Sequence, residues 1–566
     1  MKDKKILIIG LLVIFTLILI FVVRISKNEE INDGVESIIT NINLDNSDEK
    51  IVWSDYEDSV ITLSKSITIN SEGVYNVTGT IDDGMITIDV DGNVKLVLNN
   101  VNITNSNGPA IYVKNASNVV IYLEEGSINT LTDSSSYEGY EEDVSGVIYS
   151  KDDIIFDGLG TLNIKANFYD GIVGKDDLKI INGIYNIEAL DDGIRGKDSV
   201  YILDGEININ AGGDGIKSTN EEDSSKGYVK IEGGIININS NNDGIEAIFN
   251  VLIDNGSINI KTNNGSSNTS IKNGWSSSIG SGAKGIKADN NIVIVGGNIV
   301  LDTSDDSIHS NNYVGVSNAN ITINSGDDGI HADNEIIIDS GFINIEKSYE
   351  GIESAKVTIN GGNIKLVASD DGINVAGGAD NSGFGRPGEN SFVNNSNYSM
   401  NISGGNIVID ATGDGLDANG SIYITGGNII VDGPTNNGNG ALDYDGVFNI
   451  SGGSLIAIGA SGMAQGVSNT SMQNGVLINF SSTYNSGSVV KILDSSDNEI
   501  ISYKANKSFS SFVYSSSNLI KGNYKIYVDD ILYTEFSVSS VSTMVGQGGM
   551  GGPGMNQNMG QRQRMR

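Results

Sequence analysis

The stretch "SGDDGIHADNEIIIDSGFINIEK", Ser325 to Lys347, contains one unit of the repeat that decides the fold. Its phrase "DDGIH" has the counterpart "DDSIH" 22 residues earlier and "YEGIE" 22 residues later. After each phrase come two further runs rich in β-branched residues, separated by the turn formers Gly, Asn and Asp. Three short strands in 22 residues cannot enclose a core alone, so the units are expected to stack on one another.

The phrase acid-Gly-Ile is the anchor of this repeat. The interval between successive anchors is 22 residues in five of nine cases and 21 in a sixth, and the longer intervals are typical of units that carry a loop. The aliphatic residue after each anchor is predicted to face inward and to form one ladder from Ile172 to Leu416. The ten anchor positions are Gly171, Gly193, Gly215, Gly244, Gly285, Ser307, Gly329, Gly351, Gly372 and Gly415.

Alternation within the runs also indicates a solenoid of short parallel strands. In "EININA", Glu206 to Ala211, the isoleucines are expected to point inward and the polar residues outward. A leucine-rich repeat would need a helical leg, and a propeller would need longer antiparallel blades; the sequence shows neither pattern. We therefore predict an all-β chain that forms a right-handed parallel β-helix with 22 residues in a typical rung.

Composition narrows the possible functions. The 566-residue chain has no cysteine, which excludes disulfides, thiolate metal ligands and a cysteine nucleophile. It has 72 glycines and 4 prolines without a Gly-X-Y period, which excludes collagen. The formal charge of -37 argues against nucleic acid and anionic lipid surfaces as partners and favours association with cations.

The two ends of the chain differ from the repeat. Residues 1–27 are predicted to be an uncleaved membrane anchor, because Ile6–Val23 carries no charge and no small-x-small cleavage site follows it. The expected location is therefore the cell membrane, with a single-pass anchor and a monomeric body outside the cell. The other predicted parts are a linker at 28–52, the β-helix at 53–475, a β cap at 476–540 that closes the open solenoid end, and a disordered Gly/Met/Gln/Arg tail at 541–566.

The residue before the anchor is acidic in nine of the ten units. Equivalent residues of a parallel coil lie about 4.8 Å apart, where like charges repel by about 3–4 kcal/mol at an effective dielectric near 20. Hydrogen bonds from turn N–H groups, protonation, or divalent cations between rungs would each offset this repulsion.

Some turns carry two adjacent acids, which a turn hydrogen bond to one aspartate does not explain. Doubled acids on adjacent rungs place four carboxylates together, and such a group suits the oxygen shell of Ca²⁺. The predicted calcium ligands are Asp191, Asp192, Asp214, Asp305, Asp306, Asp327, Asp328, Asp370 and Asp371.

The two histidines of the chain, His309 and His331, occupy the same repeat position on adjacent rungs and are expected to stack. One interpretation is a duplicated repeat on a polar face; the other is a site where the imidazoles and nearby aspartates share a metal or a sugar carboxylate. Long inserts of a solenoid often carry its binding function, and two such inserts contain Trp275 and Arg386. The candidate sugar contacts are Trp275, His309, His331, Lys287 and Arg386.

Several phrases are similar to a known family. "VNITNSNGPAIYVKNASNVVIYLEEGSINTLTD", "DDGIRGKDSVYI" and "AKGIKADNNIVI" resemble, in order along the chain, the clostridial family of carbohydrate-binding domain-containing proteins. The resemblance covers roughly Trp53 to Ser540. It implies a right-handed parallel β-helix like the coil of pectate lyases, calcium sites, and binding of cellulose or polygalacturonate outside the cell. The family's Asp-Asp-Gly turns match the calcium positions Asp191, Asp192, Asp214, Asp327 and Asp328, and no sugar-contact residue is carried over.

Three functions remain open from the sequence. The first is a calcium-binding, non-catalytic, membrane-anchored protein that binds an acidic or cellulosic polysaccharide. The second is a calcium-dependent polysaccharide lyase, in which Lys217, Lys287 or Arg195 takes a proton from the uronate ring. Nearby carboxylates stabilise the charged form of a lysine, which argues against the second function. The third is a structural or adhesion solenoid without glycan specificity.

Overall fold

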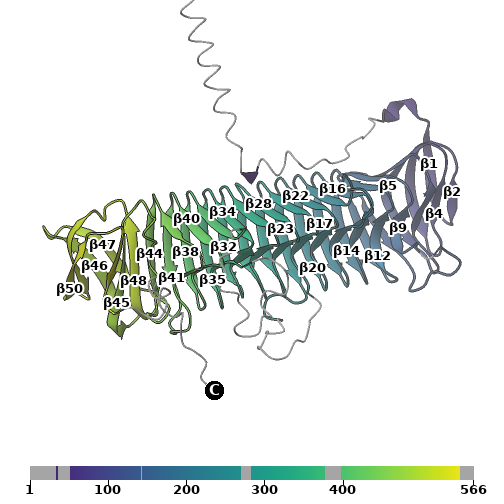
Figure 1. Cartoon of the computed structure of the whole chain (residues 1–566). Helices are drawn as coiled ribbons and strands as arrows, with labels where there is room; N and C mark the ends of the chain where they lie inside the picture. The colour runs from purple at the N-terminus through teal and green to yellow at the C-terminus, as the bar shows by residue number, and fades with distance from the viewer. Residues whose placement is uncertain (1–33, 36–50, 142, 269–281, 377–396, 548–566) are drawn as a thin grey trace, which may run out of the picture.

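The computed structural model describes residues 34–35, 51–141, 143–268, 282–376 and 397–547. The predicted anchor at Ile6–Val23, most of the linker, the C-terminal tail, and the insert residues Trp275 and Arg386 lie outside these ranges. Among the described residues, no helix has both the length and the apolar character that a membrane span requires. Figure 1 shows an elongated stack of coils, with β1 and β2 at one end and a separate group of strands around β46 and β50 at the other.

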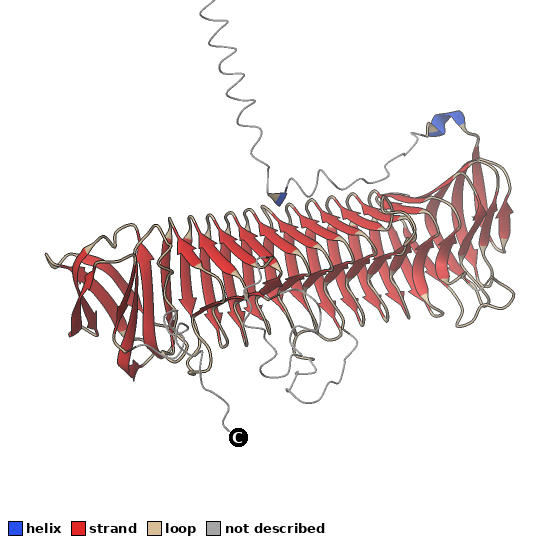
Figure 2. Ribbon diagram, in the orientation of Figure 1, coloured by secondary structure: helices blue, strands red, loops and turns tan. Residues whose placement is uncertain are grey.

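Each coil contributes one strand to each of three parallel ladders, as the red arrows of Figure 2 show. Ladder one is a 15-stranded sheet whose strands pair only with their counterparts in the coils before and after. In most coils its strand is three residues long, with the two outer residues facing the core and the middle residue facing out. The strands of ladder one are β2 (Ile67–Ile69), β4 (Ile86–Asp89), β6 (Ile111–Asn115), β9 (Gly146–Ser150), β12 (Asp170–Gly174), β15 (Ile194–Gly196), β18 (Ile216–Ser218), β21 (Ile245–Ala247), β24 (Ile286–Ala288), β27 (Ile308–Ser310), β30 (Ile330–Ala332), β33 (Ile352–Ser354), β36 (Ile373–Val375), β39 (Leu416–Ala418) and β42 (Leu442–Tyr444).

Ladder two follows ladder one within each coil. Its strands are β7 (Asn118–Leu123), β10 (Ile154–Gly158), β13 (Asp177–Ile180), β16 (Ser199–Ile202), β19 (Tyr228–Ile231), β22 (Asn250–Ile253), β25 (Asn291–Ile294), β28 (Tyr313–Val316), β31 (Glu335–Ile338), β34 (Lys356–Ile359), β37 (Ser399–Ile402), β40 (Ser421–Ile424) and β43 (Phe448–Ile450).

Ladder three completes each coil and leads into the next strand of ladder one. Its strands are β8 (Ile128–Thr132), β11 (Thr161–Ala166), β14 (Ile184–Ala189), β17 (Glu206–Ala211), β20 (Ile235–Ser240), β23 (Ser257–Thr262), β26 (Asn298–Asp302), β29 (Asn320–Asn324), β32 (Phe342–Lys347), β35 (Asn363–Ala368), β38 (Asn406–Ala411), β41 (Asn428–Asp432) and β44 (Ser454–Gly459).

The first coils are less regular than the rest. A 3₁₀ turn, η1 (Trp53–Asp55), precedes β1 (Asp58–Leu63), which pairs in parallel with β3 (Gly73–Ile81). The long strand β5 (Asn93–Thr104) then pairs with β7 through its first half and with β8 through its second half. The single strand β5 therefore pairs with ladder two and with ladder three, and the later coils have a separate strand for each of these two ladders.

The predicted aliphatic ladder is confirmed by the register of ladder one. Ile172 pairs with Ile194, and Ile194 pairs with Ile216, so the anchor isoleucines stack directly on one another. The ladder extends beyond the predicted limits at both ends, from Ile67 to Leu442. Most of its residues are fully buried within one continuous core that runs the length of the solenoid. The parallel β-helix expected from the sequence is therefore confirmed.

A cap of mainly antiparallel strands covers the last coil and has its own apolar core. Strand β48 pairs in antiparallel fashion with β44 of the last coil and with β45, so the solenoid end does not present an open edge. Lys507 also joins the cap to the solenoid, because its Nζ lies 2.5 Å from Asp410 Oδ1. The strands of the cap are β45 (Gly475–Tyr484), β46 (Val489–Asp494), β47 (Glu499–Lys504), β48 (Phe509–Ser516), β49 (Gly522–Val528), β50 (Ile531–Val538) and β51 (Ser542–Val545).

Candidate functional site

A row of acidic residues follows the corner between ladder three and ladder one, and we call it the acidic stripe. In most coils, the backbone N–H of a member donates to the carboxylate of its counterpart one coil earlier; for example, Asp214 N lies 2.9 Å from Asp192 Oδ1, and Asp243 N lies 2.9 Å from Asp214 Oδ1. One of the three predicted ways to offset the repulsion is thus present, although the bond crosses coils instead of closing a turn. The acidic stripe consists of Asp170, Asp192, Asp214, Asp243, Asp306, Asp328, Glu350, Asp371 and Asp414.

The second oxygen of most stripe carboxylates meets a side chain from the middle position of ladder one, which lies either three residues later in the chain or in the next coil. We call these middle positions the partner row. Arg195 lies 2.5 Å from Asp170, and Lys217 Nζ lies 2.6 Å from Asp214. In register, the partner row runs Arg195, Lys217, Glu246, Lys287, His309, His331, Glu353, Asn374, Asp417 and Asp443.

The proposed lyase bases lie in this partner row and are held as cations. The ammonium of Lys217 lies 2.6 Å from Asp214 and 2.7 Å from Glu246, and Lys287 lies 2.5 Å from Glu246. Although burial opposes the charge, the carboxylates raise the pKa of Lys217 and of Lys287 above the ordinary lysine value. A lysine must lose its proton before it can act as a base, so this geometry argues against the lyase mechanism.

The doubled acids at Asp305–Asp306 and Asp327–Asp328 have cations of the chain itself beside them. Lys284, the residue that breaks the acidic series, places its Nζ 2.7 Å from Asp306 and 3.6 Å from Asp305. Although burial opposes ionisation, the Lys284 ammonium holds the pKa of Asp306 well below its usual range. The Lys284 ammonium therefore supplies at this cluster a positive charge that the sequence analysis assigned to calcium.

The two histidines stack, as predicted, with ring centroids 4.7 Å apart and planes 14° apart. His309 Nδ1 lies 2.8 Å from Asp306, and His331 Nδ1 lies 3.2 Å from both Asp328 and Glu353. These carboxylates raise the pKa of His331 above its ordinary value against the effect of burial, so the ring is charged at neutral pH. The histidines are only 3% and 1% exposed, and their contact with a sugar stays a prediction.

The pair Asp191–Asp192 retains features that fit calcium. Carboxylate oxygens of Asp170, Asp191 and Asp192 lie within 4.8 Å of one another. Gly213 stands beside this pair in the next coil, and a Cβ there would lie 2.3 Å from Asp191 Oδ1 and 2.6 Å from Asp192 Oδ1. Only a residue without a side chain leaves this space open, and the oxygen donors around it are those that Ca²⁺ prefers.

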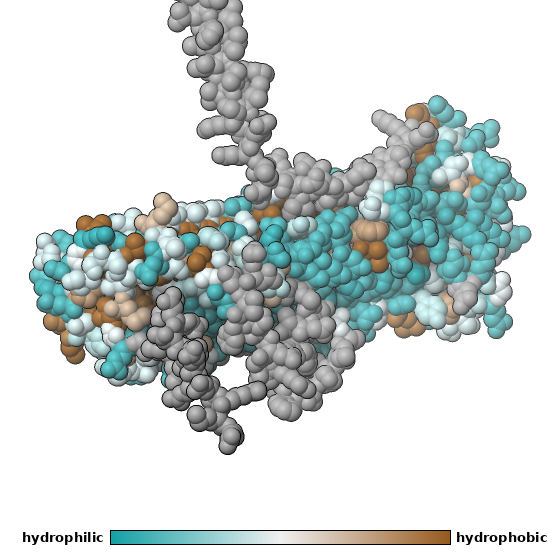
Figure 3. Space-filling view, in the orientation of Figure 1, coloured by the Kyte–Doolittle hydropathy of each residue, from teal (hydrophilic) through white to brown (hydrophobic). Residues whose placement is uncertain are grey.

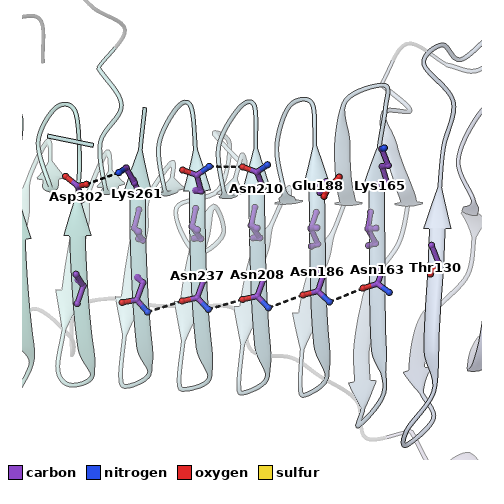
Figure 4. A pocket seen from close by; sticks show the side chains of 18 residues that line it. Thr130, Asn163, Lys165, Asn186, Glu188, Asn208, Asn210, Asn237, Lys261 and Asp302 are labelled. Carbon is purple, nitrogen blue, oxygen red and sulfur yellow. Dashed lines mark hydrogen bonds and ion pairs between the residues drawn. The ribbon is translucent and has the colours of Figure 1, made fainter. Parts of the chain in front are cut away.

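A second candidate site is a groove on the outer face of ladder three, which we call the asparagine groove. It spans strands β8 to β26 and encloses about 780 Å³. Two rows of outward-facing side chains border it, and the inward-facing isoleucines between the rows contribute only their backbone to its floor. Figure 4 shows the rows crossing neighbouring coils, parallel to the solenoid axis.

The first row of the asparagine groove is a continuous chain of amide hydrogen bonds. Asn186 Nδ2 donates to Asn163 Oδ1 at 2.9 Å, and Asn208 Nδ2 donates to Asn186 Oδ1 at 3.0 Å. Asn237 and Asn259 continue the chain at 2.9 and 3.0 Å. Asn208 Nδ2 also donates to Glu206 at 3.2 Å, and the other amides of the row keep a second N–H and a second lone pair for another partner.

The second row has balanced charge. Asn239 donates to Asn210 at 2.7 Å, and Lys261 pairs with Asp302 at 3.3 Å. Lys165 and Glu188 stand on neighbouring coils of the same row. Two cations and two anions give the groove no net charge, although the chain as a whole carries -37. On the face that Figure 3 shows, hydrophilic residues dominate the N-terminal half of the solenoid, and apolar patches gather toward the cap.

Comparison with known proteins shows what part of this β-helix is similar to. Residues 64–329 match the family model of the carbohydrate-binding domain-containing proteins. This stretch contains the whole asparagine groove and the first part of the acidic stripe. The resemblance that the sequence suggested is thereby confirmed over these residues.

Individual relatives agree with this match. A carbohydrate-binding domain-containing protein of Acetivibrio thermocellus is 39% identical over 147 residues, which are 25% of this chain and 51% of the relative. The aligned region therefore spans about half of that relative's length. A solved structure, described as the polysaccharide lyase-like protein from C. thermocellum in a gadolinium derivative, is 30% identical and is matched over 48% of this chain and 87% of its own. Its TM-score of 0.33 is too low to support an argument about the site.

Sequence reasoning found the acidic stripe but missed the asparagine groove. The signal was present in runs such as "EININA", where asparagines recur at outward positions one coil apart. Of the predicted sugar contacts, Lys287 is half-buried and forms ion pairs with Asp243 and Glu246, and Trp275 and Arg386 lie outside the described residues. These contacts stay predictions, and the asparagine groove on ladder three is a second candidate surface for a glycan.

Proposed function

We propose that this chain is a non-catalytic polysaccharide-binding protein whose glycan site is the asparagine groove. The single observation that carries the proposal is the first row of amides, which runs without a break along the solenoid axis over five coils. An amide presents both a donor and an acceptor, as a sugar hydroxyl does, so each coil can exchange hydrogen bonds with a glycan laid along the groove. The match of residues 64–329 to carbohydrate-binding domains supports the same assignment.

The length of the groove suits a polymer better than a single sugar. Neighbouring coils lie about 4.8 Å apart, which is close to the length of one hexose unit in an extended chain. A volume of about 780 Å³ accommodates several such units. Balanced charge in the groove favours a neutral, cellulose-like chain, while an acidic polymer would need cations to approach a protein of charge -37.

Calcium and a membrane anchor belong to the proposal as supporting parts. Asp191, Asp192 and the open space at Gly213 would hold Ca²⁺, which would offset the repulsion between neighbouring coils. The apolar run Ile6–Val23 would hold the solenoid at the outer face of the cell membrane.

The test is retention of the full-length chain, in detergent, on insoluble cellulose and on immobilised polygalacturonate, with calcium and with a chelator. Ultraviolet absorbance of the supernatant reports unsaturated products in the same samples. We expect retention on cellulose without product in either condition. Product formation would establish lyase activity instead, and absence of retention on both polymers would favour a structural solenoid.

A further inference from the structure

The outer face of ladder two becomes apolar near the middle of the solenoid. In β25, the side chains of Ile292 and Ile294 enter the core, so Val293 between them points outward. The same position is Gly315 in β28 and Ile337 in β31, and we call Val293, Gly315 and Ile337 the ladder-two notch. From β13 to β34, the outward residues in register are Lys179, Tyr201, Lys230, Leu252, Val293, Gly315, Ile337 and Thr358.

The apolar residues of the notch are covered although they point outward. Val293 is 2% exposed and Ile337 is 5% exposed, whereas Tyr423, which holds the same position in β40, is 39% exposed. Among the described residues, Val35 covers them: it is itself 1% exposed and forms one apolar cluster with Val293 and Ile337. Figure 1 shows the short segment Gly34–Val35 (purple) beside β28, far along the solenoid from β1. Part of the predicted linker therefore packs against the solenoid.

A glycine explains why a valine fits at this place. Val293 and Ile337 lie two coils apart, about 9.6 Å, so a residue that joins them in one cluster must lie over Gly315. Gly315 has no side chain, and this leaves room for the side chain of Val35 between its two neighbours. The contact removes apolar surface of all three aliphatic residues from water, which stabilises it.

A hydrogen bond fixes the backbone of the same segment. Val35 N–H donates to Asp339 Oδ2 at 2.7 Å, and Asn360 Nδ2 donates to the other oxygen of this carboxylate at 2.7 Å. Asp339 directly follows β31 and therefore stands at the edge of the notch. A Cβ on Gly34 would lie 2.8 Å from Asp339 Oδ2, so the close approach of the backbone requires glycine. Apolar and polar contacts thus converge on two consecutive residues.

We propose that the ladder-two notch and Asp339 form a docking site for the chain's own N-terminal segment, which Gly34 and Val35 occupy. The solenoid is then held at its middle coils and not only through its first coil. The docking site lies on ladder two and shares no residue with the asparagine groove on ladder three, so the inference goes beyond the proposed glycan binding.

One consequence of docking rests on the membrane anchor that belongs to the proposed function. With Ile6–Val23 as this anchor, residues 24–33 separate it from Gly34, and a chain of that length spans at most about 35 Å. The docked segment therefore turns ladder two toward the membrane and keeps the middle coils close to it. A tether attached only at the first coil would leave the solenoid free to point away.

The experiment uses a single cysteine as a probe, since the chain has none of its own. Val35→Cys is prepared in the full-length chain in detergent, and the rate at which a maleimide modifies it is measured. A docked residue is protected, so this rate is expected to be about tenfold lower than that of Tyr423→Cys, which lies exposed in the row of the notch. Equal rates for the two variants overturn the proposal.

Gly315→Leu in the Val35→Cys background tests the notch directly. The leucine side chain fills the notch, so the modification rate of the cysteine is expected to rise about tenfold. The unfolding temperature, followed by circular dichroism, should stay near that of the Val35→Cys chain, because position 315 faces away from the core. An unchanged modification rate in a folded Gly315→Leu chain overturns the proposal.

Asp339→Ala tests the hydrogen bond and is expected to raise the same rate, because the N–H of Val35 loses its acceptor. Asp254→Ala is the matched control, since Asp254 holds the equivalent position three coils earlier, outside the notch. It should leave the rate unchanged, and an equal effect of both substitutions counts against the docking site.

Dilution separates docking within one molecule from docking on a second copy. Protection of Val35→Cys that persists after about tenfold dilution supports the proposal, and protection that is lost on dilution overturns it in favour of exchange between copies. Neither readout involves cellulose or a lipid bilayer, so a failure of glycan binding or of the anchor leaves this test intact.

Discussion

The backbone N–H of Asp214 donates a 2.9 Å hydrogen bond to Oδ1 of Asp192, which holds the same position one coil earlier. This contact makes a buried carboxylate part of the framework that fixes the spacing of coils. The acid belongs to the repeat because it accepts a hydrogen bond across coils. Its negative charge is offset by different side chains in different coils.

Asp192→Ala and Asp192→Asn separate these two roles. The alanine variant leaves the N–H of Asp214 without an acceptor in a buried site, so the free energy of unfolding is expected to fall by about 1–3 kcal/mol. The asparagine variant keeps an acceptor oxygen and removes the charge, and is expected to lose less than the alanine variant at pH 7. Denaturant unfolding of both variants tests this ordering, and equal losses would contradict it.

Lys284→Gln should convert the Asp305–Asp306 pair into a metal-dependent site. The substitution removes the ammonium that lies 2.7 Å from a carboxylate that is 2% exposed. Breaking a buried ion pair from one side costs about 3–5 kcal/mol, so the variant is expected to unfold at a lower temperature in chelator. Added calcium should recover part of this loss.

The matched control for this substitution is Lys491→Gln, whose ion pair with Asp530 is largely exposed. Its unfolding temperature should stay near that of the wild type, because exposed ion pairs contribute little. If Lys284→Gln behaves like this control, Lys284 does not neutralise the buried acids.

Without divalent metal, stability should depend on pH with a maximum on the acidic side of neutrality. Burial, and the charges of Asp214 and Asp170, raise the pKa of Asp192 to about 7, and burial raises that of Asp243 to about 6. A raised native pKa contributes stability that is complete below the unfolded value of 3.8 and is lost as pH rises through the native value. These groups therefore destabilise the fold between about pH 4 and 7.

Glu246 acts in the opposite direction. Although burial opposes it, hydrogen bonds from Lys217 and Lys287 lower the pKa of Glu246 to about 2. Its contribution is present above the unfolded value of 4.5 and is lost as pH falls through the native value. Thermal unfolding in chelator from pH 3 to 8 should thus show the highest midpoint at about pH 4 to 4.5, between the two unfolded values. A midpoint that rises steadily to pH 8 would refute this assignment.

Substitutions in the asparagine groove should weaken glycan binding without weakening the fold. Asn208 and Asn237 lie at the centre of the first row, and replacing both with alanine removes two half-buried amides and the 2.9 Å bond between them. Each lost hydrogen bond to a sugar costs about 0.5–1.5 kcal/mol, so retention on cellulose should fall about tenfold.

The matched control for the groove is the double variant Asn406→Ala and Asn428→Ala. These asparagines also share a hydrogen bond across coils, at 3.0 Å, but lie outside the groove. Both double variants should unfold at similar temperatures. Equal loss of retention in both would show that asparagine ladders only stabilise the solenoid.

The register of the β-helix was predictable because the same anchor contact repeats in every coil of the regular part. Ile194 must stack on Ile172 once the strands are short and parallel, so spacing alone assigned the inward face. The coil of Leu442 lies within the predicted β-helix, but its anchor was not recognised because Gly-Ala-Leu replaces acid-Gly-Ile. The first coils also lie within the predicted range, and their repeat could not be read because β5 serves two ladders and hides the three-strand period.

The site was harder to predict because it depends on which side chains meet across coils. Lys284 looked like an interruption of the acidic series, yet its ammonium reaches Asp306 in the next coil. His309 and His331 were placed correctly on adjacent coils, but the sequence could not show that carboxylates enclose them. The spacing along the chain predicts where a residue lies in its coil. The side chains of the neighbouring coil determine whether that residue is charged.

The amide hydrogen bonds in the first row of the asparagine groove all run one way. Asn186 donates to Asn163, Asn208 donates to Asn186, and the same sense continues to Asn259. The row of amides is therefore a polar track with a head and a tail. A polysaccharide also has two unlike ends, one reducing and one non-reducing. We expect the track to distinguish them, so that every bound chain points in the same direction along the protein.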